Sequence, residues 1–104
     1  MIELAPNHKA GLSLHSRLMP AAGCFGYGVE YASLLDTTLF GAIVTNPVSL
    51  RPRRGAPQPR LVELGDGFVL NAGDQNPGVR VVVRRYADAW RRVGVPVSMP
   101  KGLM

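Results

Sequence analysis

The sequence predicts an α/β fold with parallel strands, and three observations lead to it. Residues 39–45 form a continuous apolar run, which is typical of a strand buried on both faces. Residues 77–93 place apolar side chains at helical spacing along one face. The expected order is hairpin, strand, helix, strand, long loop, helix and strand, and such alternation implies parallel strands with right-handed crossovers.

The first 45 residues are expected to form a hairpin and then a βαβ unit. Residues 2–5 and 12–14 alternate at period two around a turn-rich segment, which predicts a hairpin within residues 1–17. Residues 18–23 read as a short apolar strand that ends in small residues, where a flat ligand could approach the backbone closely. Residues 30–36 are expected to form a short helix, with Tyr31, Leu34 and Leu35 on one face. With the run 39–45, this unit spans residues 18–45.

Residues 46–76 change character, because prolines and glycines interrupt every regular pattern. A loop of about thirty residues is unusual in a compact domain and is generally functional or disordered. Within it, residues 61–64 and 68–70 flank Gly65-Asp66-Gly67 and predict a small hairpin. We therefore expect a functional or disordered loop that carries a hairpin of its own.

Residues 77–99 predict the clearest helix of the chain and a third strand. Asn76 suits the N-cap and Pro77 the first helical position, where its missing N–H costs nothing. Gly94 is expected to end the helix, and residues 95–99 to form the strand. Trp90 lies on the apolar face, which indicates a core anchor rather than a ligand-stacking residue.

The composition limits the classes of protein that remain. The chain has 104 residues, of which 46% are hydrophobic, so it demands a core. No apolar stretch is long enough to span a bilayer and no signal pattern opens the chain, which predicts a cytoplasmic protein. The single cysteine, Cys24, excludes an internal disulfide and is expected to be a buried small hydrophobe. His8 and His15 lack ligand spacing, so we expect no metal site.

The net charge of +5 comes mainly from arginines in residues 51–60 and 80–92. Clustered guanidinium groups can neutralise phosphates, which raises nucleic acid as a partner. No nucleic-acid motif is present and only 7% of residues are aromatic, which argues against that partner. The cluster in residues 51–60 either is a solvated loop or attracts an anionic substrate or a protein partner.

Several separated motifs resemble one enzyme family. Residues 20–28 (Pro-Ala-Ala-Gly-Cys-Phe-Gly-Tyr-Gly), 41–45 (Gly-Ala-Ile-Val-Thr), 49–53 (Ser-Leu-Arg-Pro-Arg), 55–60 (Gly-Ala-Pro-Gln-Pro-Arg) and 75–79 (Gln-Asn-Pro-Gly-Val) are similar, in order and spacing, to class 1 dihydroorotate dehydrogenases. The resemblance runs from about residue 12 to residue 99. It identifies the chain as the N-terminal portion of that family, and it implies that residues 46–76 are the proline-rich active-site loop.

The resemblance implies a fold and a reaction. The family is a TIM (β/α)8 barrel that binds FMN at its C-terminal face and oxidises dihydroorotate to orotate in pyrimidine biosynthesis. A complete barrel takes roughly 250 residues, so residues 1–104 are expected to be a single partial barrel domain with the N-terminal hairpin and the first β/α units. One subgroup of the family works with an iron–sulfur flavoprotein partner that passes electrons to NAD.

Carrying the family's site residues across exposes substitutions. The serine that meets the flavin falls at Ala22, and the lysine close to flavin and orotate falls at Asn46, which removes a cation. The substrate-loop asparagine matches Leu70 by strict count or Asn71 after a one-residue slip, and Pro100 replaces the asparagine that ends the third strand. The implied cofactor contacts are Ala21, Ala22, Gly23, Asn46 and Pro47, and the implied substrate contacts are Asn46, Asn71, Ala72, Gly73 and Asp74.

Two functions of different classes remain. The first is a dihydroorotate dehydrogenase-like FMN oxidoreductase segment that is not catalytic alone, since the family's catalytic cysteine is expected beyond the end of this chain and Cys24 is not its equivalent. The second is a non-catalytic truncated or degenerate paralogue that acts as an assembly or binding module. A partial barrel leaves a strand edge unpaired, which predicts a homo-oligomer or completion by another chain.

Overall fold

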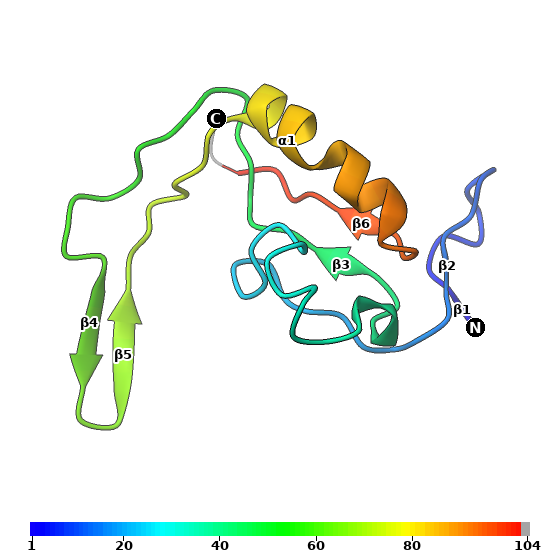
Figure 1. The fold of residues 1–104 in the computed structure, drawn as a ribbon, viewed down its shortest axis with the longest axis horizontal. Coiled ribbons are helices and arrows are strands. Elements are labelled where there is room, and N and C mark those ends of the chain that lie inside the picture. Colours follow the sequence, from blue (N-terminus) through cyan, green and yellow to red (C-terminus); the bar gives the residue numbers. More distant parts are fainter. Residues whose placement is uncertain (103–104) are drawn as a thin grey trace.

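The computed structural model describes residues 1–102, and a parallel strand pair lies at its centre (Figure 1). Strand β3 (Ile43–Val44) pairs with β6 (Val97–Ser98), with Ile43 opposite Val97 and Val44 opposite Ser98. Helix α1 (Val79–Arg92) precedes β6 and lies beside it. Both strands point toward the side from which residues 46–76 leave, so the predicted parallel pairing is confirmed.

The N-terminal hairpin is also confirmed. Strand β1 (Ile2–Glu3) pairs antiparallel with β2 (Ser13–Leu14). The Glu3 carboxylate accepts from the backbone N–H groups of Ala5 at 2.7 Å and Leu12 at 2.6 Å, and from the Ser13 hydroxyl at 2.7 Å. One side chain therefore fixes the loop between two very short strands.

The βαβ unit expected over residues 18–45 is wrong in its first two elements. Residues 18–23 form no strand, because only one backbone bond, from the Gly41 N–H to the Leu18 carbonyl at 2.8 Å, joins them to the segment before β3. Residues 30–36 form turns, and the only helical element nearby is the 3-10 turn η1 (Thr37–Leu39). The Tyr31 ring contacts Phe25, with centroids 5.0 Å apart, but Leu34 is 78% exposed, so the expected apolar face does not pack as a whole. A short helix without tertiary packing is not stable.

The expected hairpin within the long loop is confirmed and extends away from the body of the molecule (Figure 1). Strand β4 (Leu61–Leu64) pairs with β5 (Gly67–Leu70), and every residue of both strands is exposed. The two arms that lead to it are tied together by the Arg53–Asn76 bridge and by the bond from the Ala56 N–H to the Ala72 carbonyl at 3.0 Å.

Helix α1 begins two residues later than Pro77. Gly78 is the N-cap, with a φ of 89° that glycine adopts without strain, and its N–H donates to the Asn76 Oδ1 at 2.9 Å. Asn76 thus caps the chain just before the helix rather than at its N-cap position. Gly94, with a φ of 82°, follows the C-cap Val93, so the predicted end of the helix is confirmed.

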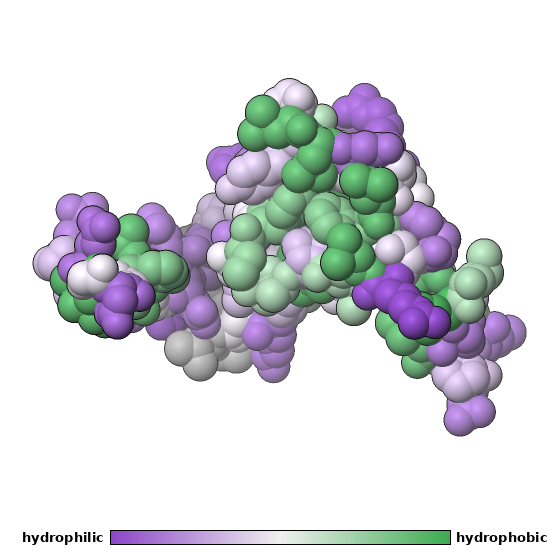
Figure 2. All heavy atoms as spheres, turned by 90° about the horizontal axis from the view of Figure 1, so that it is seen from below, coloured by the Kyte–Doolittle hydropathy of each residue, from purple (hydrophilic) through white to green (hydrophobic). Residues whose placement is uncertain are grey.

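The core is small. Phe25, Ile43 and Val95 are buried together, and three half-buried side chains, Phe40, Val93 and Val97, pack against them. Large apolar side chains of residues 18–40 remain exposed and gather on the face that Figure 2 shows. The 1–102 segment therefore forms a partial α/β arrangement that does not close into a barrel.

Two expectations about single side chains have different outcomes. Cys24 is exposed, which contradicts its expected burial, because it lies in a turn with no covering element. Trp90 is half-buried against the body, where its Nε1 donates to the Tyr27 carbonyl at 2.7 Å and its ring stacks on Tyr86. None of the helices in the described part of the chain is long and apolar enough to cross a membrane.

Candidate functional site

A polar cavity of about 440 Å³ lies where the chain leaves β3. Four parts of the chain contribute to it: the turn after residue 25, the residues that follow β3 together with the first arm of the long loop, the approach to α1, and α1 itself through Arg85. Its lining residues are Tyr27, Asn46, Arg53, Gln75, Asn76, Pro77 and Arg85. Ligands of α/β proteins with parallel strands bind at the carboxyl ends of those strands, so this cavity is the candidate site.

Asn46 is held at the carboxyl end of β3 by backbone hydrogen bonds. The preceding residue, Thr45, is fully buried and donates its N–H to the Ser98 carbonyl of β6 at 2.9 Å. The Asn46 N–H donates to the Gly26 carbonyl at 2.8 Å, which links the end of β3 to the turn that follows Phe25. The side-chain Oδ1 of Asn46 is buried and has no hydrogen-bond partner within residues 1–102.

Ser49, beside the cavity, and Asn76, which lines it, join two segments of the chain at this site. Both side chains are buried, and the Asn76 Nδ2 donates to the Ser49 Oγ at 3.0 Å and to the Asp74 carbonyl at 2.8 Å. The Asn76 Oδ1 accepts from the Ser49 N–H at 3.2 Å and from the Gly78 N–H. Every polar atom of this amide is therefore used to join the two arms of the long loop.

Arg53 is fixed through its backbone. Its N–H donates to the Asn76 carbonyl at 2.9 Å, and the Asn76 N–H donates to its carbonyl at 3.1 Å. Its Nε is buried and finds no acceptor among the described residues. A buried donor without a partner costs about 1–3 kcal/mol, and more when it is charged, so this atom needs an acceptor.

The electrostatics of the cavity favour an anionic or electron-rich ligand. Arg53 and Arg85 bring two guanidinium groups, and no carboxylate of residues 1–102 lines the cavity. Burial, with smaller contributions from Tyr86 and Glu30, raises the pKa of Tyr27, so its hydroxyl stays protonated at neutral pH. The cavity can therefore donate hydrogen bonds to an oxygen-rich group, and Asn46 can accept one.

The structure separates the predicted cofactor contacts. Asn46 lines the cavity and Pro47 follows it half-buried, whereas Ala21, Ala22 and Gly23 lie exposed in a turn and do not line it. Because a turn stands where a strand is expected, Ala21, Ala22 and Gly23 do not pair with β3 and do not reach its carboxyl end.

The predicted substrate contacts divide in the same way. Asn71 and Ala72 are exposed at the foot of the hairpin, while Gly73 and Asp74 are half-buried with left-handed φ values of 65° and 56°. Asp74 and Pro47 approach the same place, since a Cβ built on Gly102 would lie 3.5 Å from the Asp74 Oδ2 and 3.5 Å from the Pro47 Cβ. The structure thus brings Pro47 and Asp74 to one end of the sheet but leaves Asn71 and Ala72 outside.

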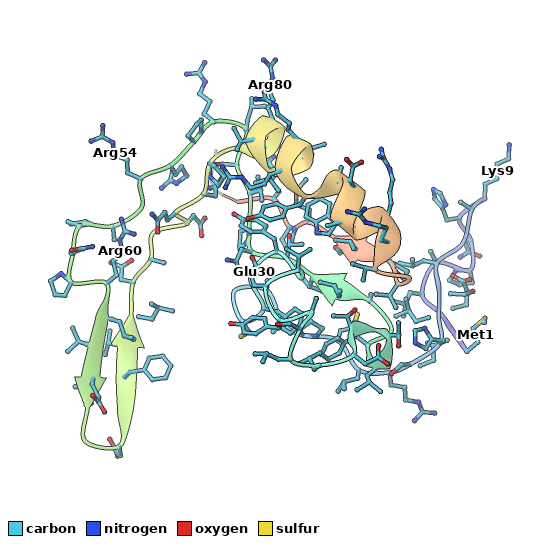
Figure 3. The ribbon with its side chains drawn as sticks, in the orientation of Figure 1. Met1, Lys9, Glu30, Arg54, Arg60 and Arg80 are labelled. Atoms are coloured by element: carbon cyan, nitrogen blue, oxygen red, sulfur yellow. The ribbon has the colours of Figure 1, made fainter. Side chains whose placement is uncertain are left out.

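The sequence pattern assigned no site role to four cavity residues: Tyr27, Arg53, Gln75 and Arg85. Arg53 belongs to the charge cluster of residues 51–60, which could equally be a solvated loop. Hydrophobic periodicity predicts helices and strands, but it does not predict which side chains of an irregular loop come together. Arg60 of the same cluster is structural: its guanidinium donates to the carbonyls of Ala56 at 2.8 Å and Arg54 at 2.6 Å and to the Gln75 Oε1, between the two arms of the loop (Figure 3). Among residues 1–102, no three His, Cys, Asp or Glu side chains group as a metal site would.

The chain is similar to known proteins over most of its length. The sequence profile of the family described as dihydroorotate dehydrogenase matches residues 6–102. A protein of Bacillus pumilus (strain SAFR-032), named dihydroorotate dehydrogenase B (NAD(+)), catalytic subunit, is 47% identical over 87 residues, which are 84% of this chain and 28% of that protein. Proteins with the same name from Endomicrobium trichonymphae and Streptococcus pneumoniae (strain ATCC BAA-255 / R6) are 40% identical over 88 residues and 45% identical over 73 residues.

These relatives are much longer than the matched region. The alignments cover 85% and 70% of this chain but only 29% and 23% of the Endomicrobium and Streptococcus proteins. The chain therefore spans little more than a quarter of the length of the curated relatives it matches. Because the family profile covers nearly all of the described residues, the chain belongs to the dihydroorotate dehydrogenase family.

Proposed function

We propose that this chain forms one wall of the binding site of a dihydroorotate dehydrogenase-like oxidoreductase, which converts dihydroorotate to orotate in pyrimidine biosynthesis. The observation that carries the proposal is the polar cavity at the carboxyl end of β3, in a chain that belongs to this family. Its position is the one that ligands take in barrels of parallel strands. The full TIM barrel, with residues 46–76 as its active-site loop and residues 77–99 as one helix and strand of the barrel, belongs to the same proposal.

The cavity residues fit FMN as the cofactor. The pyrimidine edge of a flavin presents an N–H beside carbonyl oxygens, and the cavity offers an acceptor, the Asn46 Oδ1, and a donor, the Arg53 Nε, that lack partners within residues 1–102. When bound, FMN would supply the acceptor for the hydride of dihydroorotate. The two arginines would stabilise negative charge on a bound group, and Tyr27 and Pro77 would exclude water from it.

The remaining predicted contacts would come from the exposed segments. Ala21, Ala22, Gly23, Asn71 and Ala72 would meet cofactor or substrate only if these turns close over the cavity. We propose that such closure needs chain beyond these 104 residues. Cys24 would not act as the catalytic base, because it is an exposed turn residue away from the cavity lining.

We propose that the 104-residue chain binds but does not catalyse. Its completion by another chain, or a homo-oligomer, follows from the exposed apolar side chains of residues 18–40. The relatives are named catalytic subunits, which supports a partner of a second kind, and the iron–sulfur flavoprotein that the family resemblance implies is our candidate.

The test is a titration of the purified 104-residue chain with FMN, followed by the flavin absorbance and fluorescence. A shifted absorbance and quenched fluorescence are expected, with a weaker effect for Asn46→Ala. If the spectrum is unchanged both for the chain alone and after addition of the remaining part of a relative, the FMN proposal is wrong. Oxidation of dihydroorotate by the isolated chain would contradict the claim that it is not catalytic.

A non-catalytic assembly module is the second candidate, and the projecting hairpin favours it. Leu61, Phe68 and Leu70 expose 59–67% of their surface around a depression of about 560 Å³ on β4 and β5. An apolar surface of this kind is typical of an interaction site. Self-association that depends on these residues, together with no spectral change on addition of FMN, would decide for this candidate.

A further inference from the structure

The cavity contains an unusual pair of atoms. The buried Asn46 Oδ1 accepts from nothing and the buried Arg53 Nε donates to nothing among residues 1–102, and both residues line the same space. Buried polar atoms are paired in the large majority of cases, so two unpaired atoms of opposite kind in one cavity indicate a ligand that satisfies both.

The pair specifies the chemistry of that ligand. The amide oxygen of Asn46 needs an N–H, and the guanidinium of Arg53 needs a carbonyl or anionic oxygen. A cyclic imide carries an N–H directly beside carbonyl oxygens, and both the flavin ring and the orotate ring contain one. The remaining lining, which includes Arg85 and lacks carboxylates, suits a ligand that carries negative charge.

Arg53 differs from Arg54 and Arg60, two other arginines of the long loop. Arg54, the next residue, is exposed and extends away from the body (Figure 3). Arg60 uses its guanidinium on the loop itself. Arg53 alone among these three combines a backbone fixed on both sides by Asn76 with a buried Nε that has no protein acceptor within residues 1–102.

We propose that Arg53 supplies the positive charge of the binding site and, together with Asn46, holds the cyclic-imide edge of the ligand. The proposal rests on the proposed function and adds a residue to it. At Asn46 the family resemblance places a lysine, and a neutral amide cannot replace that charge. A guanidinium is charged at every physiological pH, so Arg53 provides it from the neighbouring wall of the cavity.

The experiment measures binding of three probes to the full chain by isothermal titration calorimetry: FMN, orotate and uracil. Uracil has the imide without the carboxylate, so it separates the two features. Arg53→Gln is expected to weaken binding of FMN or orotate by about tenfold or more, because it removes a charge-assisted hydrogen bond. Arg54→Gln is the matched control and is expected to change the affinity by less than about twofold, since exposed charges contribute little. Arg53→Lys should recover part of the loss.

Two further variants test the charge and the pairing. Adding Asn46→Lys to Arg53→Gln returns a cation to the cavity, so it should restore most of the lost affinity. Asn46→Asp has the shape of the native side chain but gives Arg53 a carboxylate partner, so it should keep the fold and abolish orotate binding. If Asn46→Asp binds orotate as well as the native chain does, the inference is wrong.

The outcomes separate this inference from the proposed function. If FMN does not bind but orotate or uracil binds in an Arg53-dependent way, Arg53 has its role and the FMN site is refuted. If FMN or orotate binds equally to Arg53→Gln and Arg54→Gln, the proposed function stands and the role of Arg53 is refuted. If Arg53→Gln unfolds at a lower temperature but binds the probes with unchanged affinity, the guanidinium of Arg53 stabilises the fold only, and its role in binding is refuted. Binding of none of the three probes refutes both.

Discussion

At the scale of single residues, a few polar side chains replace the regular structure that this chain lacks. Asn76 joins the two arms of the long loop, Arg60 ties the foot of the hairpin, and Glu3 holds the loop between β1 and β2. Each binds backbone groups of loops and turns that would otherwise be left without partners. Their removal should therefore cost more than the loss of an average surface contact.

Asn76→Ala should lower the free energy of unfolding by about 2–3 kcal/mol, because it leaves Ser49 and the Gly78 N–H without their partner in a buried place. Asn71→Ala is the control, since Asn71 is exposed, and its effect should stay within about 0.5 kcal/mol. Urea unfolding followed by the fluorescence of Trp90 measures both. Equal midpoints for the two variants would contradict the role of Asn76.

Glu3 gives a pH-dependent prediction. The Leu12 N–H, and after it the Ser13 hydroxyl and the Ala5 N–H, lower the pKa of Glu3 below its usual 4.5. A depressed folded pKa contributes stability that is present above the unfolded value and disappears as the pH falls through the folded one. The hairpin should therefore loosen only below about pH 4.5, and Glu3→Gln should be loosened already at neutral pH. NMR titration of the Leu12 and Ala5 amide signals tests this, and a Glu3 midpoint at or above 4.5 would refute it.

At the scale of elements, the long loop keeps its shape because its two arms cross closely. A Cβ on Gly55 would lie 2.3 Å from the Ala72 carbonyl oxygen, and a Cβ on Gly73 would lie 2.5 Å from the Ala56 nitrogen. Both glycines also have left-handed φ values of 83° and 65°. The crossing thus requires glycine on each arm for reasons of space and of backbone conformation.

Gly55→Ala should open this crossing at a cost of about 1–3 kcal/mol, because the backbone of Ala72 must move and the left-handed conformation is strained for alanine. The Ala56 amide, which donates to the Ala72 carbonyl, should then exchange its hydrogen faster. Gly65→Ala is the matched control, since a Cβ there meets nothing within 4 Å. If the two variants exchange the Ala56 amide at the same rate, the crossing does not depend on Gly55.

At the scale of the whole molecule, the described residues bury few apolar side chains and leave many exposed. The core consists of a few side chains around Ile43, and the projecting hairpin extends the molecule to 43 × 34 × 29 Å. Leu61 and Leu70 pair on one face of that hairpin, and Phe68 is 67% exposed beside them. A surface of this kind favours association with other chains.

The chain should therefore self-associate at micromolar concentration, and Phe68→Ser with Leu70→Ser should weaken the association by about tenfold, since two apolar side chains leave the contact. Leu34→Ser, at an exposed leucine of residues 18–40, shows whether that segment contributes to the association as well as β4 and β5. Light scattering over a dilution series measures it. A native chain that stays monomeric throughout would contradict the prediction.

The sequence by itself determined the elements whose signal is local. Two short apolar stretches around a Gly-Asp-Gly turn predict β4 and β5, and period two predicts β1 and β2. Helical spacing and Gly94 predict α1 and its end, and a continuous apolar run predicts the region of β3. The motifs also identified the family, which the comparisons confirm. In each case neighbouring residues carry the information, so no distant contact is needed to read it.

Only the tertiary structure decided the rest. The expected helix of residues 30–36 fails because Leu34 finds nothing to pack against, and Cys24 is exposed because no element covers its turn. The cavity joins Tyr27, Asn46, Arg53 and Asn76 from segments far apart in the sequence, through backbone bonds that leave no pattern in it. A long irregular loop acquires its shape from such distant contacts, and for that reason Arg53 differs from Arg54 only in the folded chain.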